Sequence, residues 1–282
     1  MESQKAHECP LHYLSLLNSS KRTRDRLQEA KSVVDMSRID FTGKTLLLTG
    51  SNGGIGRETA IQFRAAGANV VMGEHTVDLD HDFATTLDPT GEHVLSFHLE
   101  AGSSASNDAF VAAAVAKFGS IDFVVPAAGI YPEQAITEIT NEQWDKVMSV
   151  NLDAVFYLIR ACVPHMNEGG SIVNVASLAG HRGSNRHAHY AASKGGLLAL
   201  TRSLTWEFGS KVRVNAVSPG IIDTTMTTDL IETRGESLLA QTPLGRFGQA
   251  SEVASVIAFL CSPAASFVNG ETIQINGGLY ES

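Results

Sequence analysis

The chain has 282 residues, and 43% of them are hydrophobic, which is enough material for a sizeable core. Its formal net charge of -9 and its pI near 5.5 argue against a nucleic-acid-binding protein, because such a protein needs a basic surface. The three cysteines, Cys9, Cys162 and Cys261, are widely spaced and form no CxxC pair, so we predict no metal site and no disulfide framework, and we expect free thiols in a reducing cytoplasm.

Residues 1–40 differ in composition from the rest, and we interpret them as an N-terminal extension. The segment is rich in charge and contains no glycine. Residues 21–36 fit one amphipathic helix, and the alternative is a partly disordered tail. The apolar residues around Leu16 are soon followed by Lys21 and Arg22, which is not a signal-peptide pattern. Because no apolar run approaches the roughly 18 residues of a membrane helix, we expect no membrane association.

From Gly43 onward, short apolar runs alternate with helical patterns. The apolar runs predict strands at 45–49, 69–72, 93–97, 121–125, 171–175, 212–217 and 272–275. Helical patterns indicate helices at 55–66, 107–118, 142–166, 188–208 and 252–260. This alternation is typical of a parallel sheet covered on both faces, so the sequence predicts one doubly wound α/β domain over 41–282.

A glycine-rich turn joins the first strand to the first helix. Gly50, Gly54 and Gly56 have the spacing GxxxGxG. Glycines here allow a tight turn, close approach of the backbone to a pyrophosphate and close packing of helix on strand, and the helix N-terminus offers free N–H groups. Many turns are rich in glycine without binding anything, but this position favours a dinucleotide site. To that site we assign Gly50, Ser51, Asn52, Gly54, Ile55 and Gly56.

The residue that ends the second strand bears on the choice of dinucleotide. Glu74 stands about 20 residues after the turn, where a carboxylate accepts hydrogen bonds from ribose hydroxyls and repels the 2′-phosphate of NADP. Arg57 is the only basic candidate nearby. We therefore predict NAD rather than NADP. The alternative for Glu74 is an ordinary solvated carboxylate.

Tyr190 and Lys194 lie four residues apart at the start of a predicted helix, which puts both side chains on one face. The pKa of a free tyrosine is about 10, and a neighbouring ammonium favours the phenolate. Tyr190 is therefore a candidate acid/base. A chance YxxxK spacing carries little weight alone.

Two polar residues strengthen this hypothesis. Ser177 follows the strand at 171–175, at the carboxyl edge of the sheet, where open α/β sheets bind ligands. Its hydroxyl can polarise the substrate oxygen that Tyr190 protonates. Asn151 lies inside a predicted helix, where asparagine is unfavourable. A buried asparagine there bonds either the backbone or a water in a proton relay.

Together these residues resemble the short-chain dehydrogenase/reductase family, in its single-domain branch. The glycine turn, Asn151, Ser177, Tyr190 and Lys194 occur in the family's order and approximate spacing, and the resemblance covers about residues 39–278. It implies seven parallel strands in the order 3-2-1-4-5-6-7. It also implies hydride transfer between a nicotinamide cofactor and a secondary alcohol or ketone, in a homotetramer or homodimer.

The resemblance further implies a role for each residue. Tyr190 would be the acid/base, Ser177 would orient the substrate oxygen, and Lys194 would lower the tyrosine pKa and bind ribose. Asn151 would hold a water of a proton relay. Besides the glycine turn, Glu74, Tyr190 and Lys194, cofactor contacts are implied for His98, Leu99, Ala127, Ala128, Gly129, Pro219, Gly220, Ile222 and Thr224.

Two departures from the family pattern concern cofactor binding. Pro126-Ala127-Ala128-Gly129 stands where the family has Asn-Asn-Ala-Gly, so the asparagine's stabilising bonds are missing. His98 stands where an aspartate often reaches the adenine. We expect adenine to bind more weakly or differently, with the fold unchanged.

The substrate is less defined. The segment 178–189 should line the cleft, and its histidines and arginines suggest a polar or anionic substrate; we assign substrate contact to Ser177, His187 and Tyr190. A solvated loop is the alternative. Residues near 224–245 are predicted to form a mobile lid whose Met226, Leu230 and Leu238 favour a partly hydrophobic substrate.

Two other function classes remain open at this point. One is a redox-neutral epimerase or dehydratase on the same scaffold, which the GxxxGxG spacing and the short C-terminal region disfavour. The other is a non-catalytic NAD-binding protein, which the intact serine, tyrosine and lysine set disfavours.

Overall fold

The computed structural model describes residues 39–75 and 77–280. The predicted N-terminal helix at 21–36 lies outside the described residues. The chain from Asp40 onward forms one compact unit.

Seven parallel strands form the central sheet. They are β1 (Thr45–Thr49), β2 (Asn69–Glu74), β3 (Val94–His98), β4 (Ile121–Pro126), β5 (Met166–Val175), β6 (Val212–Pro219) and β9 (Thr272–Ile275). Their order, β3-β2-β1-β4-β5-β6-β9, confirms the predicted doubly wound topology. The order reverses between β1 and β4, and open α/β sheets bind ligands at such a switch point.

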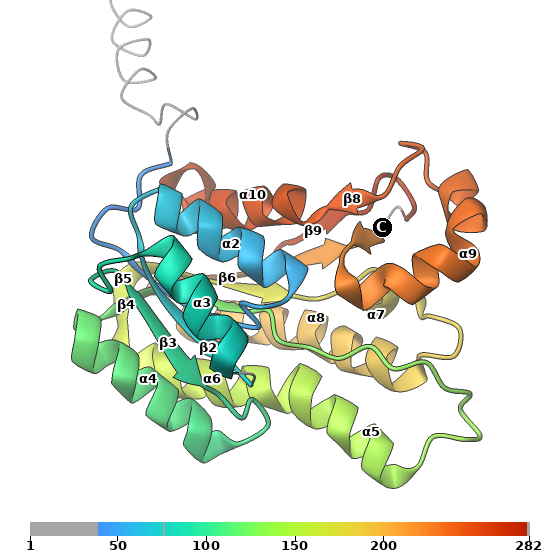
Figure 1. Ribbon diagram of the computed structural model, residues 1–282, viewed down its shortest axis with the longest axis horizontal. Coiled ribbons are helices and arrows are strands. Elements are labelled where there is room, and N and C mark those ends of the chain that lie inside the picture. Colours follow the sequence, from blue (N-terminus) through green and yellow to red (C-terminus); the bar gives the residue numbers. More distant parts are fainter. Residues whose placement is uncertain (1–38, 76, 281–282) are drawn as a thin grey trace, which may run out of the picture. The chain divides into compact units, whose positions relative to one another are not determined.

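Helices cover both faces of this sheet (Figure 1). On one face lie α2 (Gly54–Ala65) and α10 (Ala250–Cys261), which pack against each other. On the other lie α4 (Ser104–Phe118), α5 (Asn141–Met148), α6 (Ala154–Cys162) and α8 (Ala188–Phe208). The inner strands are buried from both sides, and Leu46, Leu47 and Leu48 of β1 are fully buried, whereas the edge strands β3 and β9 are only partly buried. The continuous apolar runs of the inner strands therefore reflect a two-sided core.

The predicted helix over 142–166 is wrong in detail. The structure divides this stretch into α5, a π-helical turn at Ser149–Asp153, α6 and a 3-10 turn at Val163–His165, and Met166 already begins β5. A π-turn inserts one residue into the helical repeat and is common at functional sites. Asn151 lies inside it.

The expectation that no segment resembles a membrane helix also needs correction. The helical stretch 141–165 is long and apolar enough to cross a membrane, with a mean hydropathy of 1.4 over its best window. Buried core helices meet the same criterion. This one packs against α4 and α8 within the described part of the chain.

Several elements are absent from the sequence-based prediction. They are α3 (Val77–Leu87), the short α7 (Ala179–Arg182), the two-stranded ribbon of β7 (Ile222–Asp223) and β8 (Gly248–Gln249), a 3-10 turn at Thr225–Thr227 and α9 (Thr228–Gln241). The last two fall within the segment predicted as a lid. In Figure 1, α7 and α9 lie at the same end of the domain.

A backbone contact without side chains holds α7 against α8. A Cβ atom on Gly180 would lie 2.8 Å from the carbonyl carbon of Lys194 and 2.9 Å from the amide nitrogen of Gly195. Real Cβ atoms do not approach backbone this closely, so only glycine fits. The contact sets the distance between the Ser177 end of β5 and the helix that carries Tyr190.

We predict that Gly180→Ala moves α7 away from α8 and lowers the free energy of unfolding by about 1–3 kcal/mol, the usual cost of overpacking. Turnover should fall with it, because Ser177 shifts relative to Tyr190. Denaturant titration and steady-state kinetics measure both effects. Gly235→Ala in α9 is the matched control, since its Cβ would make only ordinary contacts at 3.7 Å and beyond. Equal stability of the two variants would contradict the prediction.

Candidate active site

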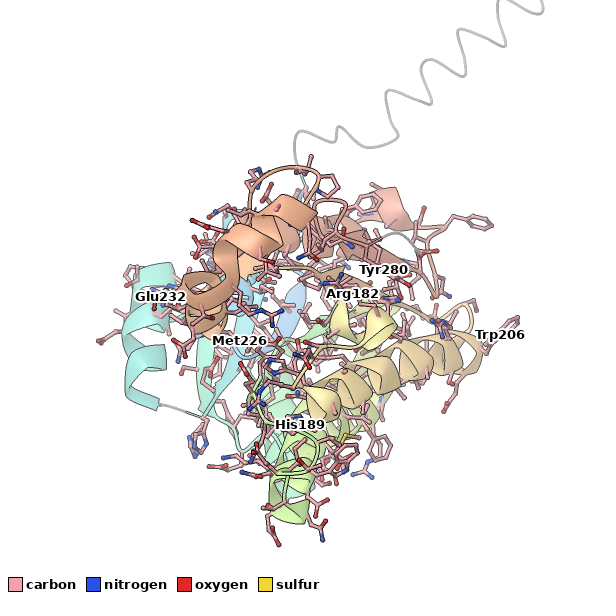
Figure 2. The ribbon with its side chains drawn as sticks, turned by 90° about the vertical axis from the view of Figure 1, so that its right-hand side faces the viewer. Arg182, His189, Trp206, Met226, Glu232 and Tyr280 are labelled. Carbon is pink, nitrogen blue, oxygen red and sulfur yellow. The ribbon has the colours of Figure 1, made fainter. Side chains whose placement is uncertain are left out.

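A cleft of about 1100 Å³ opens at the carboxyl edge of the sheet. The glycine turn, the ends of β4, β5 and β6, the start of α8 and the segment 221–241 line it. Figure 2 looks at this end of the domain, where Arg182 of α7, His189 of α8 and Met226 surround the same opening.

The glycine turn packs directly on the end of β4. Gly50 has φ +73, and a Cβ there would lie 2.6 Å from the amide nitrogen of Ala128. A Cβ on Gly56 would overlap the carbonyl oxygen of Gly50, and one on Gly54 would overlap the Thr224 methyl group. These contacts leave an open backbone surface in the cleft, which fits the close approach that a pyrophosphate needs.

Polar groups of the turn support the same assignment. The backbone N–H of Asn52 donates a 2.5 Å hydrogen bond to the Glu74 carboxylate, which therefore points back at the turn. Gly53 caps α2 without any side-chain hydrogen bond. The buried Asn52 Nδ2 has no partner among the described residues. An uncapped helix N-terminus and an unpartnered donor fit a phosphate-containing ligand.

Thr49 holds the segment after β4, where the family's asparagine is missing. Its carbonyl accepts from the Ala127 amide at 3.1 Å, and its hydroxyl accepts from the Ala128 amide at 3.3 Å. These bonds from β1 help to keep the turn at 126–129 beside Gly50.

Tyr190 and Lys194 lie buried on the floor of the cleft. Burial raises the pKa of Tyr190 to about 12, and the neighbouring Ser177 hydroxyl acts in the opposite direction. Burial lowers the pKa of Lys194 to about 8. The Lys194 ammonium donates a 2.7 Å hydrogen bond to the Val175 carbonyl and lies 5.7 Å from the Tyr190 ring centroid. In the protein alone, burial therefore sets the tyrosine pKa, and the lowering expected from Lys194 is not seen.

Asn151 lies behind the cleft rather than in its lining, and it is fully buried. Its Oδ1 accepts from the Ile130 amide at 2.8 Å, while its Nδ2 donates to the Ile130 carbonyl at 3.0 Å and to Ser193 Oγ at 3.3 Å. The side chain thus bonds the backbone of Ile130, and its expected role in holding a water of a proton relay stays a prediction. These hydrogen bonds tie the π-turn to the segment after β4 and to α8.

Tyr131 is a cleft residue that the sequence reasoning missed. Its ring meets the Tyr190 ring edge-on at 4.6 Å and stacks on His187 at 3.9 Å. His187, assigned to the substrate, is buried, bonds the Pro132 carbonyl at 2.9 Å and is not in the cleft lining. It touches the site through Tyr131. The only available signal was the position of Tyr131, two residues after the Ala-Ala-Gly turn.

His189 lies in the cleft wall beside Tyr190. The residue is fully buried, and neither ring nitrogen has a partner among the described residues. Burial lowers its pKa, so the ring is neutral. Arg182, Arg234 and Lys146 line the more open part of the cleft, and none of them forms an ion pair with a described residue.

The structure gathers most of the predicted site in the cleft. In its lining are Gly50, Gly54, Ile55, Gly56, Ala127, Gly129, Ser177, Tyr190, Lys194, Pro219, Gly220, Ile222 and Thr224. Outside it are Ser51, Asn52, Glu74, His98, Leu99, Ala128, Asn151 and His187. Leu99 is buried beneath Gly73, while His98 is half exposed and bonds Glu100 at 3.2 Å.

Known proteins share both the sequence pattern and the fold. A family model described as enoyl-(acyl carrier protein) reductase matches residues 50–280. The 3-oxoacyl-[acyl-carrier-protein] reductase FabG of Thermotoga maritima is 39% identical over 240 residues, covering 84% of this chain and 98% of that protein. FabG of Escherichia coli is 35% identical over 245 residues, covering 86% and 99%.

Among solved structures, a short-chain dehydrogenase/reductase from Brucella melitensis, titled glucose/ribitol dehydrogenase, is 48% identical with a TM-score of 0.85. The match covers 87% of this chain and 100% of the Brucella chain. A short-chain alcohol dehydrogenase described as putative, from Sinorhizobium meliloti, is 32% identical with a TM-score of 0.81 and covers 86% and 98%. The chain therefore belongs to the short-chain dehydrogenase/reductase family of oxidoreductases.

Proposed function

We propose that the protein interconverts a secondary alcohol and a ketone with NAD as cofactor and Tyr190 as the acid/base. The observation that carries the proposal is the meeting of Tyr190, Ser177 and Lys194 with the glycine turn in one cleft. When bound, the nicotinamide supplies or accepts the hydride. The redox-neutral and non-catalytic alternatives find no comparable support.

The protein's residues handle the proton and the substrate oxygen. Ser177 and Tyr190 line the same cleft, and the serine hydroxyl is near enough to affect the tyrosine pKa, so one substrate oxygen can receive a hydrogen bond from each. In reduction the Tyr190 hydroxyl gives its proton to that oxygen, and in oxidation the phenolate takes it back. The buried Lys194 ammonium favours the phenolate and is placed to bind the ribose beside Gly129.

The pKa of Tyr190 explains why the reaction needs the assembled site. Burial holds that pKa at about 12 in the protein alone, so the hydroxyl is protonated at neutral pH. A cation brought in by the oxidised cofactor adds to the effect of Lys194 and lowers the pKa. Bringing it from about 12 to about 8 requires roughly 5 kcal/mol of preferential phenolate stabilisation.

Tyr190→Phe should retain dinucleotide binding and lose turnover by about 10²–10⁴-fold, because only the proton donor and acceptor is removed. Binding is measured by dinucleotide fluorescence and turnover by absorbance of the reduced cofactor. Tyr157→Phe in α6, outside the cleft lining, is the control. A Tyr190→Phe enzyme with near-native activity would disprove the proposed mechanism.

The two reaction directions should respond oppositely to pH. Oxidation uses the phenolate, so its kcat/KM should rise as pH approaches the Tyr190 pKa of the NAD complex, which lies below the value of about 12 that burial gives in the protein alone. Reduction uses the protonated tyrosine, so its kcat/KM should be level and then fall as pH passes the Tyr190 pKa in the complex. Parallel profiles in both directions would speak against a single titrating acid/base.

NAD is preferred to NADP in this proposal because Glu74 points at the glycine turn. Arg57, the one basic candidate identified from sequence, stacks its guanidinium on the Phe83 ring at 3.8 Å. A 2′-phosphate beside Glu74 would meet a like charge.

Glu74→Gln should shift the ratio of kcat/KM for NAD over NADP at least about tenfold toward NADP, because it removes that repulsion. Steady-state kinetics with each cofactor give the ratio. Glu92→Gln, an exposed carboxylate before β3 at the opposite edge of the sheet, should leave it unchanged. Better use of NADP by the wild-type enzyme would refute the preference.

The substrate in this proposal carries a polar or anionic group beside an apolar portion. Arg182, Arg234 and Lys146 supply positive charge, and Met226, Leu230 and Leu238 supply apolar surface in the same cleft. We also propose a cytoplasmic homo-oligomer. Trp206 of α8 is 89% exposed and points away from the domain (Figure 2), and Phe156 of α6 is also exposed, as expected if these helices pack on a second copy.

A further inference from the structure

We propose that His75, His98 and Glu100 form a binding site for a zinc-like divalent metal ion at the ends of β2 and β3. One ligand atom from each residue, His75 Nδ1, His98 Nε2 and a Glu100 carboxylate oxygen, lies within 4.8 Å of the other two. No part of the proposed alcohol–ketone chemistry uses this cluster. Its sequence positions, 75, 98 and 100, show no metal-binding spacing, so only the fold reveals it.

The distances are close to those of a metal site. Glu100 Oε1 lies 3.1 Å from His75 Nδ1 and 3.2 Å from His98 Nε2. Ligands of a tetrahedral zinc ion, each about 2.0–2.2 Å from the metal, lie about 3.3–3.5 Å from one another. Two of the three edges therefore need almost no adjustment. The third edge, between the two imidazoles, has to close by rotation of exposed side chains whose ring centroids are 5.8 Å apart.

Hydrogen bonds hold the backbone at His98 and Glu100, and at Glu74 next to His75. Glu74 pairs with His98 across β2 and β3, and the Leu99 amide donates to the Glu74 carbonyl at 2.8 Å. The Glu100 amide donates to Ser106 Oγ at 3.1 Å, and its carbonyl accepts from the Ser103 amide at 2.8 Å. At His98 and Glu100 the metal would therefore order only side chains, which keeps the entropic cost of binding low.

The chemistry of the ligand set selects the class of metal. Two imidazoles and one carboxylate suit zinc, copper or nickel, whereas magnesium and calcium prefer oxygen ligands alone. In the structure both imidazole nitrogens face one carboxylate oxygen, as donors would. A neutral imidazole binds a metal through the ring nitrogen that carries no proton. Each histidine would therefore carry its proton on the ring nitrogen that faces away from the metal. The remaining coordination position is open to water.

The metal site would affect binding of the proposed cofactor. This part rests on the proposed function, which puts the adenosine end of the dinucleotide over β2 and β3 beside Glu74. An ion held by His75 and His98 would occupy the same edge of the sheet and partly neutralise the Glu74 carboxylate. We therefore expect metal and dinucleotide to weaken each other's binding, because such a coupling is reciprocal.

Isothermal titration calorimetry tests the site. Zn²⁺ is titrated into chelator-treated full-length protein that holds neither dinucleotide nor substrate. Loss of an outer-shell partner typically costs 10–100-fold in metal affinity, so loss of a ligand should cost at least about tenfold. His75→Ala, His98→Ala and Glu100→Gln should each weaken or lose the same one equivalent of Zn²⁺. His165→Ala, an exposed histidine far from this cluster in the fold, should keep it.

The three ligand residues are exposed, so their variants should melt at the wild-type temperature. The wild-type-minus-variant difference removes any contribution from histidines and cysteines elsewhere in the chain. Indistinguishable Zn²⁺ isotherms for wild type and all three variants would overturn the site. If the site is present, NADH titrations with and without Zn²⁺ should show weaker NADH binding in wild type and no such effect in His75→Ala. Unchanged NADH binding in wild type would overturn the competition. None of these titrations involves turnover, so a failure of the proposed catalysis leaves their result standing.

Discussion

The site depends on the close packing of the glycine turn against the end of β4. A single added Cβ on Gly50 would reach the backbone of Ala127 and Ala128, and one on Gly56 would reach Gly50 itself. Because these contacts involve backbone on both sides, no side-chain rearrangement can relieve them. They fix the start of α2 beside the turn at 126–129, which in turn meets Asn151 and Lys194 at Gly129. The dinucleotide half and the proton-transfer half of the cleft are therefore joined by one rigid contact.

Burial also shifts the pKa values of the two titratable residues at the floor of the cleft. Tyr190 and Lys194 are both removed from water, and burial alone makes each of them favour its neutral form. The two shifts act in the same sense, since one disfavours the phenolate and the other weakens the ammonium that would stabilise it. A buried charge is favourable only when it is paired. The arrangement thus ties the phenolate of Tyr190, the form that the proposed oxidation would use, to the arrival of additional positive charge.

Sequence patterns predicted the sheet well because its inner strands are buried from both sides and read as continuous apolar runs. The apolar runs at 45–49 and 272–275 and the helix at 188–208 match the structure residue for residue. The π-turn at Asn151 escaped prediction because its cause is tertiary: both ends of the side chain bond Ile130, 21 residues earlier. Tyr131 escaped for the same reason. Its importance lies in an edge-on contact with Tyr190 across 59 positions of sequence, which no local pattern records.

The ends of β2 and β3, where the proposed dinucleotide would place its adenosine half, differ from the family pattern. The family resemblance led to His98 as an adenine contact, yet in the structure its side chain bonds Glu100 and lies outside the cleft. The strands there end in exposed side chains, whereas the buried ends of β4 and β5 lead to the floor of the cleft, where Tyr190 lies. Sheet topology makes all these strand ends share one edge, but the close backbone contacts of the glycine turn lie at the end of β4. Side chains at the β2 and β3 ends are consequently free to acquire other ligands without disturbing Tyr190, and two imidazoles with one carboxylate are a set that a metal ion prefers.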